Sequence, residues 1–385
     1  MPPVWIQTRY QSAYALLGAM ADQFAEACRA AGREARTIDL ATDTPPEEGT
    51  LVFFNAPANL DALPPALFRP GSNLRAIQIF VDHPFALPEP VLDAWRERDG
   101  FKNLRLCLPC ADDAHLLRLR FPGLRHAWVP HAIPDSALCP REALTPDAWR
   151  AREFDIIAAG SIATEQHIAE QLARLPAAAQ TIARDTAAIM LRDPRLGFVQ
   201  ALDLAGSTAG LATGDWSAAK ALWRVTVMIV NRTRRTAVVK ALQGTRLAVF
   251  GPPAWKQFCT GTIHYAGDAP YDRIHAAHAR ARIAIAWGPT QFAHSYSERL
   301  MLAMAAGCAP ISDDRLLVRR DFPNTCALYN AADPATARAA TDHLLAHPDA
   351  ALNLAQSARD HAEHNCLWQH RVDAILAEPA HTPAR

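Results

Sequence analysis

The residues with the clearest chemical potential are Ser297-Glu298-Arg299, in the first turn of a helix predicted to start at Tyr296 after a buried apolar run and the loop 288–295. A helix that starts there directs its first N–H groups and the positive end of its dipole toward a bound anion. A carboxylate at this place can accept hydrogen bonds from both hydroxyls of a ribose. Ser295 and Glu298 also have the spacing of a capping box, in which the glutamate only closes the helix end. Both interpretations of Glu298 stay open at this point.

Three further loops follow predicted strands, and parallel sheets bind ligands outside the carboxyl ends of their strands. These loops are 55–59, 82–85 and 160–164. In the last of them, Gly160-Ser161 could offer backbone amides to an anion. The alternative is a plain turn from strand to helix with a serine cap.

Asp82 and His83 are candidate general bases because both residue types can accept a proton from a hydroxyl. Pro84 restricts His83 to an extended backbone. The plainer alternative is that Asp82 caps the next turn and His83 packs in the core. His131, at the start of a proline-rich stretch, is a third candidate with the same structural alternative.

Apolar runs of strand length alternate with helical patterns along most of the chain, which predicts βαβ units and parallel sheets. The runs that predict strands are 4–6, 35–40, 51–54, 76–81, 105–108, 126–129, 154–159, 246–250, 283–287 and 309–311. The proline-rich stretch 130–152 has few large apolar residues and is typical of a linker. We therefore expect an α/β protein of two doubly wound, Rossmann-like domains facing a cleft, the first over 1–150 with the linker at its end.

Length and composition exclude several classes of protein. The 385 residues suggest two domains, and Lys+Arg and Asp+Glu both number 39, so the formal net charge is zero and argues against a nucleic-acid partner. None of the 17 glycines forms GxGxxG or GxxxxGK[ST], which disfavours a NAD-dependent oxidoreductase. No apolar run is long enough for a transmembrane segment and no secretory signal is recognisable, so we expect a cytoplasmic protein with reduced cysteines.

Several other patterns favour structural roles. Cys107-x-x-Cys110 has the spacing of a zinc or redox motif but lies on an apolar run without a second pair, which favours core thiols. His275/His278 and His361/His364 lack an HExxH frame and are expected on helix faces. The basic patch of Arg232, Arg234, Arg235 and Lys240 is expected on a solvated helix face, with an anion site as the alternative.

The segment 271–314 resembles the donor-binding part of glycosyltransferases with the GT-B fold, and most closely the group similar to the spore-maturation protein CgeB. The residues that carry the resemblance are Tyr271, 283–287, Ser297-Glu298-Arg299, Ala305-Ala306-Gly307 and Asp313. Weaker similarities lie at 154–161, 128–134 and 367–371. The loop departs from the family pattern at Tyr296, where a smaller residue, often glycine, is common.

The resemblance implies a transferase that moves a sugar from a nucleotide-diphosphate sugar to a hydroxyl acceptor. The donor domain would span 151–355, a helix over 356–377 would cross back to the first domain, and 378–385 would be a disordered tail. Glu298 would bind the donor ribose; the other residues implied to contact the donor are Arg299, Ser297, His294, Gly160 and Ser161. His83, Asp82 and His131 would be the catalytic candidates.

No cofactor is expected, because the nucleotide-sugar is a substrate. The sequence contains no convincing DxD motif after a strand, so helix amino termini and cationic side chains would replace a metal ion. The acceptor is left open among a glycan, a lipid-linked glycan and a protein, and a peripheral membrane contact is compatible with the sequence. The alternative is a protein of the same two-domain shape that binds a nucleotide or sugar without turnover.

Overall fold

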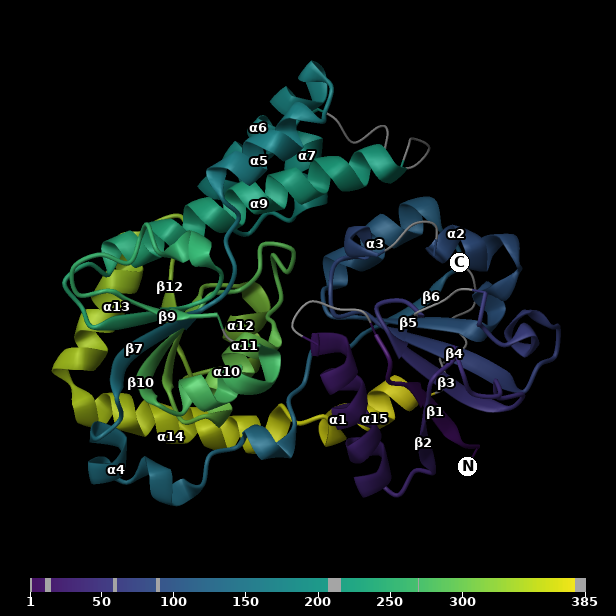
Figure 1. The fold of residues 1–385 in the computed structure, drawn as a ribbon, viewed down its shortest axis with the longest axis horizontal. Coiled ribbons are helices and arrows are strands. Elements are labelled where there is room, and N and C mark those ends of the chain that lie inside the picture. Colours follow the sequence, from purple (N-terminus) through teal and green to yellow (C-terminus); the bar gives the residue numbers. More distant parts are fainter. Residues whose placement is uncertain are drawn as a thin grey trace. The chain divides into compact units, whose positions relative to one another are not determined.

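The computed structural model describes residues 2–10, 15–57, 61–87, 91–206, 216–268 and 270–377. The chain divides into two compact units, one formed by Met1–Pro134 with Leu367–Arg385 and the other by Asp135–Cys366. Each unit contains one six-stranded sheet surrounded by helices (Figure 1). The expected α/β class with two doubly wound sheets is confirmed.

The sheet of the first unit is parallel throughout, in the order β2-β1-β3-β4-β5-β6. Its strands are β1 Val4–Gln7, β2 Ala35–Ile38, β3 Gly49–Phe54, β4 Leu74–Ile79, β5 Leu104–Leu108 and β6 Arg125–Trp128. Every residue of β3 is buried. A parallel strand covered on both faces has this continuous apolar character, which is why the sequence pattern identified it.

In the described ranges, the α-helices of the first unit are α1 Leu16–Ala30, α2 Val91–Glu97, α3 Ala111–Arg120 and α15 Gln369–Leu376. Helices α1 and α15 lie side by side although they come from opposite ends of the chain (Figure 1). Trp368, just before α15, packs edge to face on Phe24 and Phe54, with ring centroids 5.7 and 5.8 Å apart. The C-terminal segment thus supplies part of this unit's core.

The sheet of the second unit is also parallel, in the order β12-β11-β10-β7-β8-β9. Its strands are β7 Phe154–Ala159, β8 Leu247–Phe250, β9 His264–Gly267, β10 Ala281–Ala286, β11 Ala309–Asp313 and β12 Ala327–Tyr329. The sequence analysis missed β9 and β12. Both are short edge strands that are only partly buried, so neither has a continuous apolar run.

The helices of the second unit are α4 Pro146–Arg150, α5 Glu165–Ala173, α6 Ala177–Arg192, α7 Phe198–Leu204, α9 Trp216–Ala241, α10 Tyr271–His278, α11 Glu298–Ala305, α12 Leu316–Asp321, α13 Pro334–Ala346 and α14 Pro348–Asn365. The single helix expected over 356–377 is divided between α14 and α15, with α15 at Gln369–Leu376 in the first unit. The structure ends α14 at Asn365 because Leu367 pairs with Ile133 as a β-bridge, which takes the chain out of helical geometry before α15.

The boundaries of the units differ from the expected 150 and 356. Residues 135–150 belong to the second unit, because the Trp149 side chain is 1% exposed in its core and donates to the carbonyl oxygen of Gly307 at 3.2 Å. The N–H of Cys139 donates to the carbonyl of Ala305 in the same unit. The chain rejoins the first unit at Leu367. The expected disordered tail, 378–385, lies outside the described residues.

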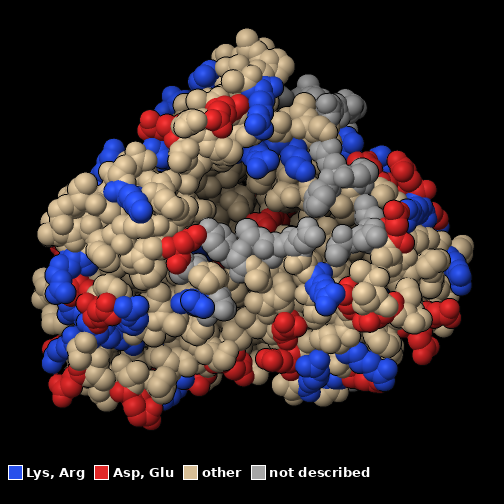
Figure 2. Space-filling view, viewed as in Figure 1, with Lys and Arg blue, Asp and Glu red and all other residues tan. Residues whose placement is uncertain are grey.

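Charges of both signs are interspersed over much of the face seen in Figure 2, in keeping with the zero formal net charge. Within the described ranges, every helix is too short or too polar to cross a membrane.

Candidate functional site

The donor-side candidates lie in the second unit around the carboxyl ends of β7 and β10. The strand order places β8 and β9 on one side of β7 and β10 to β12 on the other. The connections that leave β7 and β10 therefore run to opposite faces of the sheet. Doubly wound sheets bind their ligands at such a switch point.

Two stacked tryptophans hold the end of β7. The indole N–H of Trp287 donates to the carbonyl oxygen of Ala159 at 3.0 Å, and that of Trp255 donates to the carbonyl oxygen of Gly160 at 2.7 Å. The two ring systems stack with centroids 5.7 Å apart. A Cβ atom at position 160 would lie 2.7 Å from Nε1 of Trp287, so only glycine allows this close approach. The chain therefore leaves β7 in a fixed direction.

Two arginines of α9 hold the next carbonyls of the same loop. Nη1 of Arg235 donates to the carbonyl oxygen of Ser161 at 2.5 Å, and Nη1 of Arg232 donates to that of Ala163 at 2.7 Å. Four carbonyls over residues 159–163 are thus engaged by side-chain donors.

The preferred expectation of a solvated basic face on α9 was wrong for Arg232 and Arg235. Their exposed fractions are 7% and 4%, whereas Lys240 is exposed. Arg235 lies three and seven residues before Val238 and Leu242, which are buried in the core of the unit. This helical spacing is the signal that could have placed Arg235 on the inward face.

The backbone N–H groups of this loop remain available to a ligand. Within the part of the chain that the structure describes, those of Ser161, Ile162 and Ala163 have no hydrogen-bond partner. The next residue, Thr164, caps α5 by accepting a hydrogen bond from the N–H of His167 at 3.0 Å. Successive unpaired amides before a helix form an anion-binding concavity.

Arg299 of α11 brings a second guanidinium close to Arg235. Burial lowers the pKa of Arg235 to about 9, and the positive charge of Arg299 is the second cause. Nε of Arg235 and Nη1 of Arg299 are buried, and neither has a hydrogen-bond partner among the described residues. Two neighbouring cations with unused buried donors are stabilised by a ligand that carries several anionic oxygens.

Helix α11 begins at Glu298, two residues later than the expected start at Tyr296. Ser297 is its N-cap, and its Oγ accepts from the N–H of Arg299 at 3.4 Å. Glu298 is therefore the first helical residue instead of the third, so it does not form the capping box with Ser295. The Glu298 side chain is 7% exposed. The capping box therefore does not explain why the Glu298 carboxylate is buried at this helix amino terminus. This favours the interpretation in which Glu298 binds a ligand.

A buried ion pair shapes the loop that leads to α11. Nε of Arg315 lies 2.5 Å from Oδ2 of Asp313, whose Oδ1 accepts from the N–H of Gly288 at 2.7 Å. Nη1 of Arg315 donates to the carbonyls of Pro289, at 2.9 Å, and Phe292. The sequence analysis included Asp313 but missed Arg315. The available signal was the spacing of Asp313 and Arg315 at the end of a predicted strand, which allows the two side chains to form an ion pair.

Tyr296 is accommodated inside the unit. Its hydroxyl donates to Oδ2 of Asp321 at 2.9 Å, and its ring packs edge to face on Phe322 with centroids 4.6 Å apart. The larger side chain is thus tied to the region around α12. His294 lies half-buried on the same loop, and its carbonyl accepts from the N–H of Leu317 at 2.9 Å.

In the first unit, Asn55 fixes the position of Asp82. Asn55 follows β3 with a left-handed φ of 56°. Its Oδ1 accepts from the N–H groups of Val81, at 2.7 Å, and Asp82, at 3.1 Å, while its Nδ2 donates to Oδ2 of Asp82 at 3.0 Å. Asp82 is half-buried at the carboxyl end of β4. The carboxylate is therefore held in one orientation at a ligand-binding edge of the sheet.

His83 has a structural role in this arrangement. Its Nδ1 accepts from the N–H of Phe85 at 3.1 Å, and its Nε2 lies 3.4 Å from Oδ1 of Asp113. Burial lowers the pKa of His83 to about 3, although the charge of Asp112 opposes this shift, and burial raises the pKa of Asp113 well above its ordinary value. Because both ring nitrogens are engaged, His83 positions the 82–85 turn instead of offering the free nitrogen that a general base needs.

The nine sequence-predicted site residues divide between the two units. Asp82, His83 and His131 belong to the first, and His131 is 3% exposed after β6. The other six belong to the second unit: Gly160, Ser161, His294, Ser297, Glu298 and Arg299. Arg235 links two of their segments, because it bonds to the Ser161 carbonyl and its charge interacts with Arg299.

Among the described residues, no group of three or more His, Cys, Asp or Glu side chains could hold a metal ion. Cys107 and Cys110 are buried free thiols, and burial raises the pKa of both. Their interpretation as core thiols is confirmed.

Residues 232–377 match the model of a family described as glycosyl transferase-like. The matched segment contains Arg235, Glu298, Arg299 and Arg315. No curated protein matches the sequence.

Similar solved structures cover nearly the whole chain at low sequence identity. Sucrose-phosphate synthase from Thermosynechococcus elongatus matches with a TM-score of 0.54 at 10% identity, covering 97% of each chain. T4 phage beta-glucosyltransferase matches with a TM-score of 0.54 at 10% identity, covering 98% of this chain and 100% of that chain. The same phage enzyme in complex with UDP and Mn²⁺ matches with a TM-score of 0.50 at 10% identity, with the same coverage. These likenesses establish the class of fold: the chain has the GT-B architecture of two Rossmann-like units.

Proposed function

We propose that the protein is a glycosyltransferase that transfers a sugar from a nucleoside diphosphate sugar to a hydroxyl acceptor without a metal ion. The observation that carries this proposal is the cluster formed by the unpaired amides of 161–163, the buried guanidinium of Arg235 and the half-buried Arg299, which follows Glu298. The family match over 232–377 and the UDP complex of a structural neighbour support a nucleotide-sugar as the ligand.

In the proposed reaction, the bond between the sugar C1 and the diphosphate oxygen breaks while the acceptor oxygen bonds to C1. The electron pair of the broken bond stays on the diphosphate, where negative charge develops. The amides of 161–163 and the guanidiniums of Arg235 and Arg299 would stabilise that charge. Glu298 would accept hydrogen bonds from the ribose hydroxyls and fix the register of the donor.

The finer assignments rest on the family resemblance. We propose a hexosyltransferase similar to the CgeB-like group, acting in the cytoplasm on a glycan, a lipid-linked glycan or a protein. Ser297 and His294, which belong to the segment that leads to Glu298, would complete the contacts to the donor. Asp82 would receive the proton of the acceptor hydroxyl if the enzyme inverts the anomeric centre.

Thermal-shift measurements with UDP, GDP, dTDP, CMP and their sugars test the proposal. At least one nucleotide is expected to raise Tm, because a ligand that binds only the folded state stabilises it. The shift should be unchanged by EDTA, since cationic side chains occupy the role of a metal. If no nucleotide raises Tm, the assignment of the donor site is wrong. If EDTA abolishes the rise in Tm, the proposal that binding needs no metal ion is wrong.

Arg299→Ala is expected to weaken binding of the nucleoside diphosphate about tenfold, because one charge-assisted contact to phosphate is lost. Binding of the corresponding nucleoside, which has no phosphate, should change little. Isothermal titration of both ligands measures the difference. Arg320→Ala is the matched control, since that arginine is exposed and pairs with Asp321 at the end of α12. Equal weakening of nucleoside and diphosphate would contradict the phosphate role of Arg299.

Asp82→Asn is expected to lower kcat about 100-fold while the Kd of the donor stays the same, because loss of a general base affects only the chemical step. The amide is isosteric and retains an acceptor oxygen for the Asn55 contact. Steady-state kinetics with donor titration make the measurement. His83→Gln should reduce kcat less than Asp82→Asn does. A larger loss of kcat in His83→Gln would instead make His83 the general base and Asp82 the positioning residue.

The second candidate is a protein that binds a nucleotide-sugar without turnover. The engaged ring nitrogens of His83 favour it, because they remove one of the two adjacent candidate bases. The two candidates differ in turnover. If the wild type hydrolyses or transfers the donor sugar and Asp82→Asn does so more slowly, the protein is an enzyme and not only a binding protein.

A further inference from the structure

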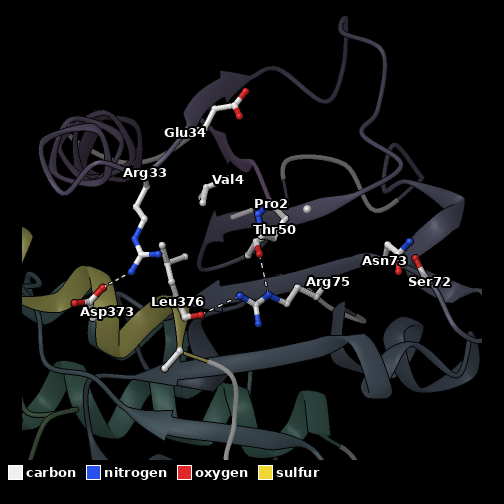
Figure 3. A pocket seen from close by; sticks show the side chains of 12 residues that line it. Pro2, Val4, Arg33, Glu34, Thr50, Ser72, Asn73, Arg75, Asp373 and Leu376 are labelled. Carbon is white, nitrogen blue, oxygen red and sulfur yellow. Dashed lines mark hydrogen bonds and ion pairs between the residues drawn. The ribbon is translucent and has the colours of Figure 1, made fainter.

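A cavity of about 720 Å³ opens in the first unit at the amino ends of its strands. It is bordered by Val4 of β1, Gly49 of β3 and Arg75 of β4, and by the last turn of α15 (Figure 3). Asp82 follows β4 at the opposite, carboxyl edge of this sheet. The cavity is therefore separate from the groups assigned to the proposed transfer reaction, and its size lies within the range of small-molecule sites.

Two guanidiniums line this cavity and are held in place by the protein. Nε of Arg75 donates to Oγ1 of Thr50 at 2.8 Å, and its Nη2 donates to the carbonyl oxygen of Leu376 at 2.9 Å. Nη2 of Arg33 lies 2.6 Å from Oδ1 of Asp373. Figure 3 shows both arginines directed toward the last turn of α15 from different walls. Because their orientations are set before a ligand arrives, little ordering entropy would oppose binding.

Two further arginines, Arg105 and Arg125, belong to neighbouring strands outside the cavity lining, which itself holds two arginines and two acids. Arg105 donates to the backbone carbonyls of Ala374 and Ile375 in α15, at 3.1 and 2.9 Å. Burial and then the charges of Arg105 and Arg75 lower the pKa of Arg125. Within the described ranges, Arg105 and Arg125 form no ion pair with a carboxylate. Arg105 thereby meets the partial negative charge at the C-terminus of α15.

The remaining wall offers groups that suit hydroxyls. Glu34, Ser72 and Asn73 line the cavity together with Arg33 and Arg75. Oγ of Ser72 accepts from the N–H of Leu74 at 3.0 Å and can still donate its own proton. Carboxylate, hydroxyl and amide groups accept and donate the hydrogen bonds of a polyol, whereas the guanidiniums match a phosphate.

We propose that this cavity binds a small phosphate ester that carries hydroxyl groups, such as a sugar phosphate, with the phosphate at Arg33 and Arg75 and the hydroxyls at Glu34, Ser72 and Asn73. The site is independent of the proposed transferase activity. Because the ligand would contact both β-strand ends and the last turn of α15, its binding would also stabilise the attachment of the C-terminal helix.

Isothermal titration of the full chain with ribose 5-phosphate, glucose 6-phosphate, inorganic phosphate and free ribose tests this site. A phosphate ester is expected to bind, inorganic phosphate to bind at least about tenfold more weakly, and ribose to give no measurable binding. Arg33→Ala should weaken the ester about tenfold. Asn73→Trp, which changes an exposed residue and leaves both arginines in place, should block the cavity.

Two control variants distinguish this site from other anion sites. Arg118→Ala removes an exposed arginine of α3 outside the cavity lining, and Arg299→Ala removes the proposed donor phosphate contact; both should leave ester binding unchanged. Binding lost in Arg299→Ala but kept in Asn73→Trp would assign the ester to the donor site and overturn the proposal. The absence of ester binding, or equal affinity for inorganic phosphate, would overturn it as well.

Discussion

Glu298→Ala is expected to lower kcat/KM for the nucleotide-sugar about 1000-fold, through weaker binding of the donor in its ground and transition states. A carboxylate that accepts two ribose hydroxyls makes two charged hydrogen bonds, each contributing about 1.5–3 kcal/mol. Their loss corresponds to roughly 100- to 10 000-fold in binding. The free energy of unfolding should fall by about 1 kcal/mol or less, since Ser297 caps the helix end through its own Oγ and Glu298 adds one acidic charge to the first turn.

Titration calorimetry with the donor and urea unfolding together measure both quantities. Asp349→Ala is the matched control, because Asp349 is also an acid in the first turn of a helix but its side chain is 82% exposed. It should change neither donor binding nor kinetics. A Glu298→Ala protein with unchanged donor affinity and a clearly lowered free energy of unfolding would return Glu298 to a purely structural role.

Arg315→Met is expected to lower the free energy of unfolding by about 3–5 kcal/mol, because it leaves the Asp313 carboxylate buried without its partner. The carbonyls that Arg315 engages at Pro289 and Phe292 would lose a donor at the same time. Gly288 approaches so closely that a Cβ there would lie 2.4 Å from Cζ of Arg315, so the loop is built around the guanidinium. Donor binding should fall with stability, since this loop positions Glu298.

Arg319→Ala provides the comparison. Arg319 lies on α12, which Arg315 directly precedes, and also pairs with an acid, Asp314, but its side chain is 63% exposed. Exposed pairs contribute about 0–1 kcal/mol, so this variant should unfold close to the wild type. Urea unfolding measures both variants. Equal losses in the free energy of unfolding would mean that burial does not increase the contribution of the Arg315–Asp313 pair to stability.

Much of the fold was accessible from the sequence because its central strands are covered on both faces. Strands such as β3 and β7 appear as continuous apolar runs for that reason. Edge strands β9 and β12 lack this signal. The boundary near 150 was misplaced because residues 135–150 are rich in proline, and the inward orientation of Trp149 depends on contacts with residues far along the chain.

The site was partly predictable for a different reason. Loops at strand ends and a Ser-Glu-Arg helix start are local patterns, and they pointed to Gly160, Ser161, Glu298 and Arg299. Arg232 and Arg235 were assigned the wrong surroundings, because a cluster of three arginines within four positions of α9 is typical of a solvated face, although the spacing of Arg235 to Val238 and Leu242 indicates an inward position. The engagement of His83 by Phe85 and Asp113 is likewise a property of the folded chain. Whether Asp82 and Glu298 act in one reaction stays a prediction.

The packing of Trp368 against Phe24 and Phe54 has a consequence for biosynthesis. The ribosome completes the sheet of the first unit more than two hundred residues before it adds this tryptophan. Until Trp368 and α15 are synthesised, the nascent chain exposes the aromatic surface that they later cover, which is the kind of surface that molecular chaperones recognise. We expect truncation before Leu367 to yield an aggregation-prone amino-terminal half, even though every strand of that half has already been synthesised.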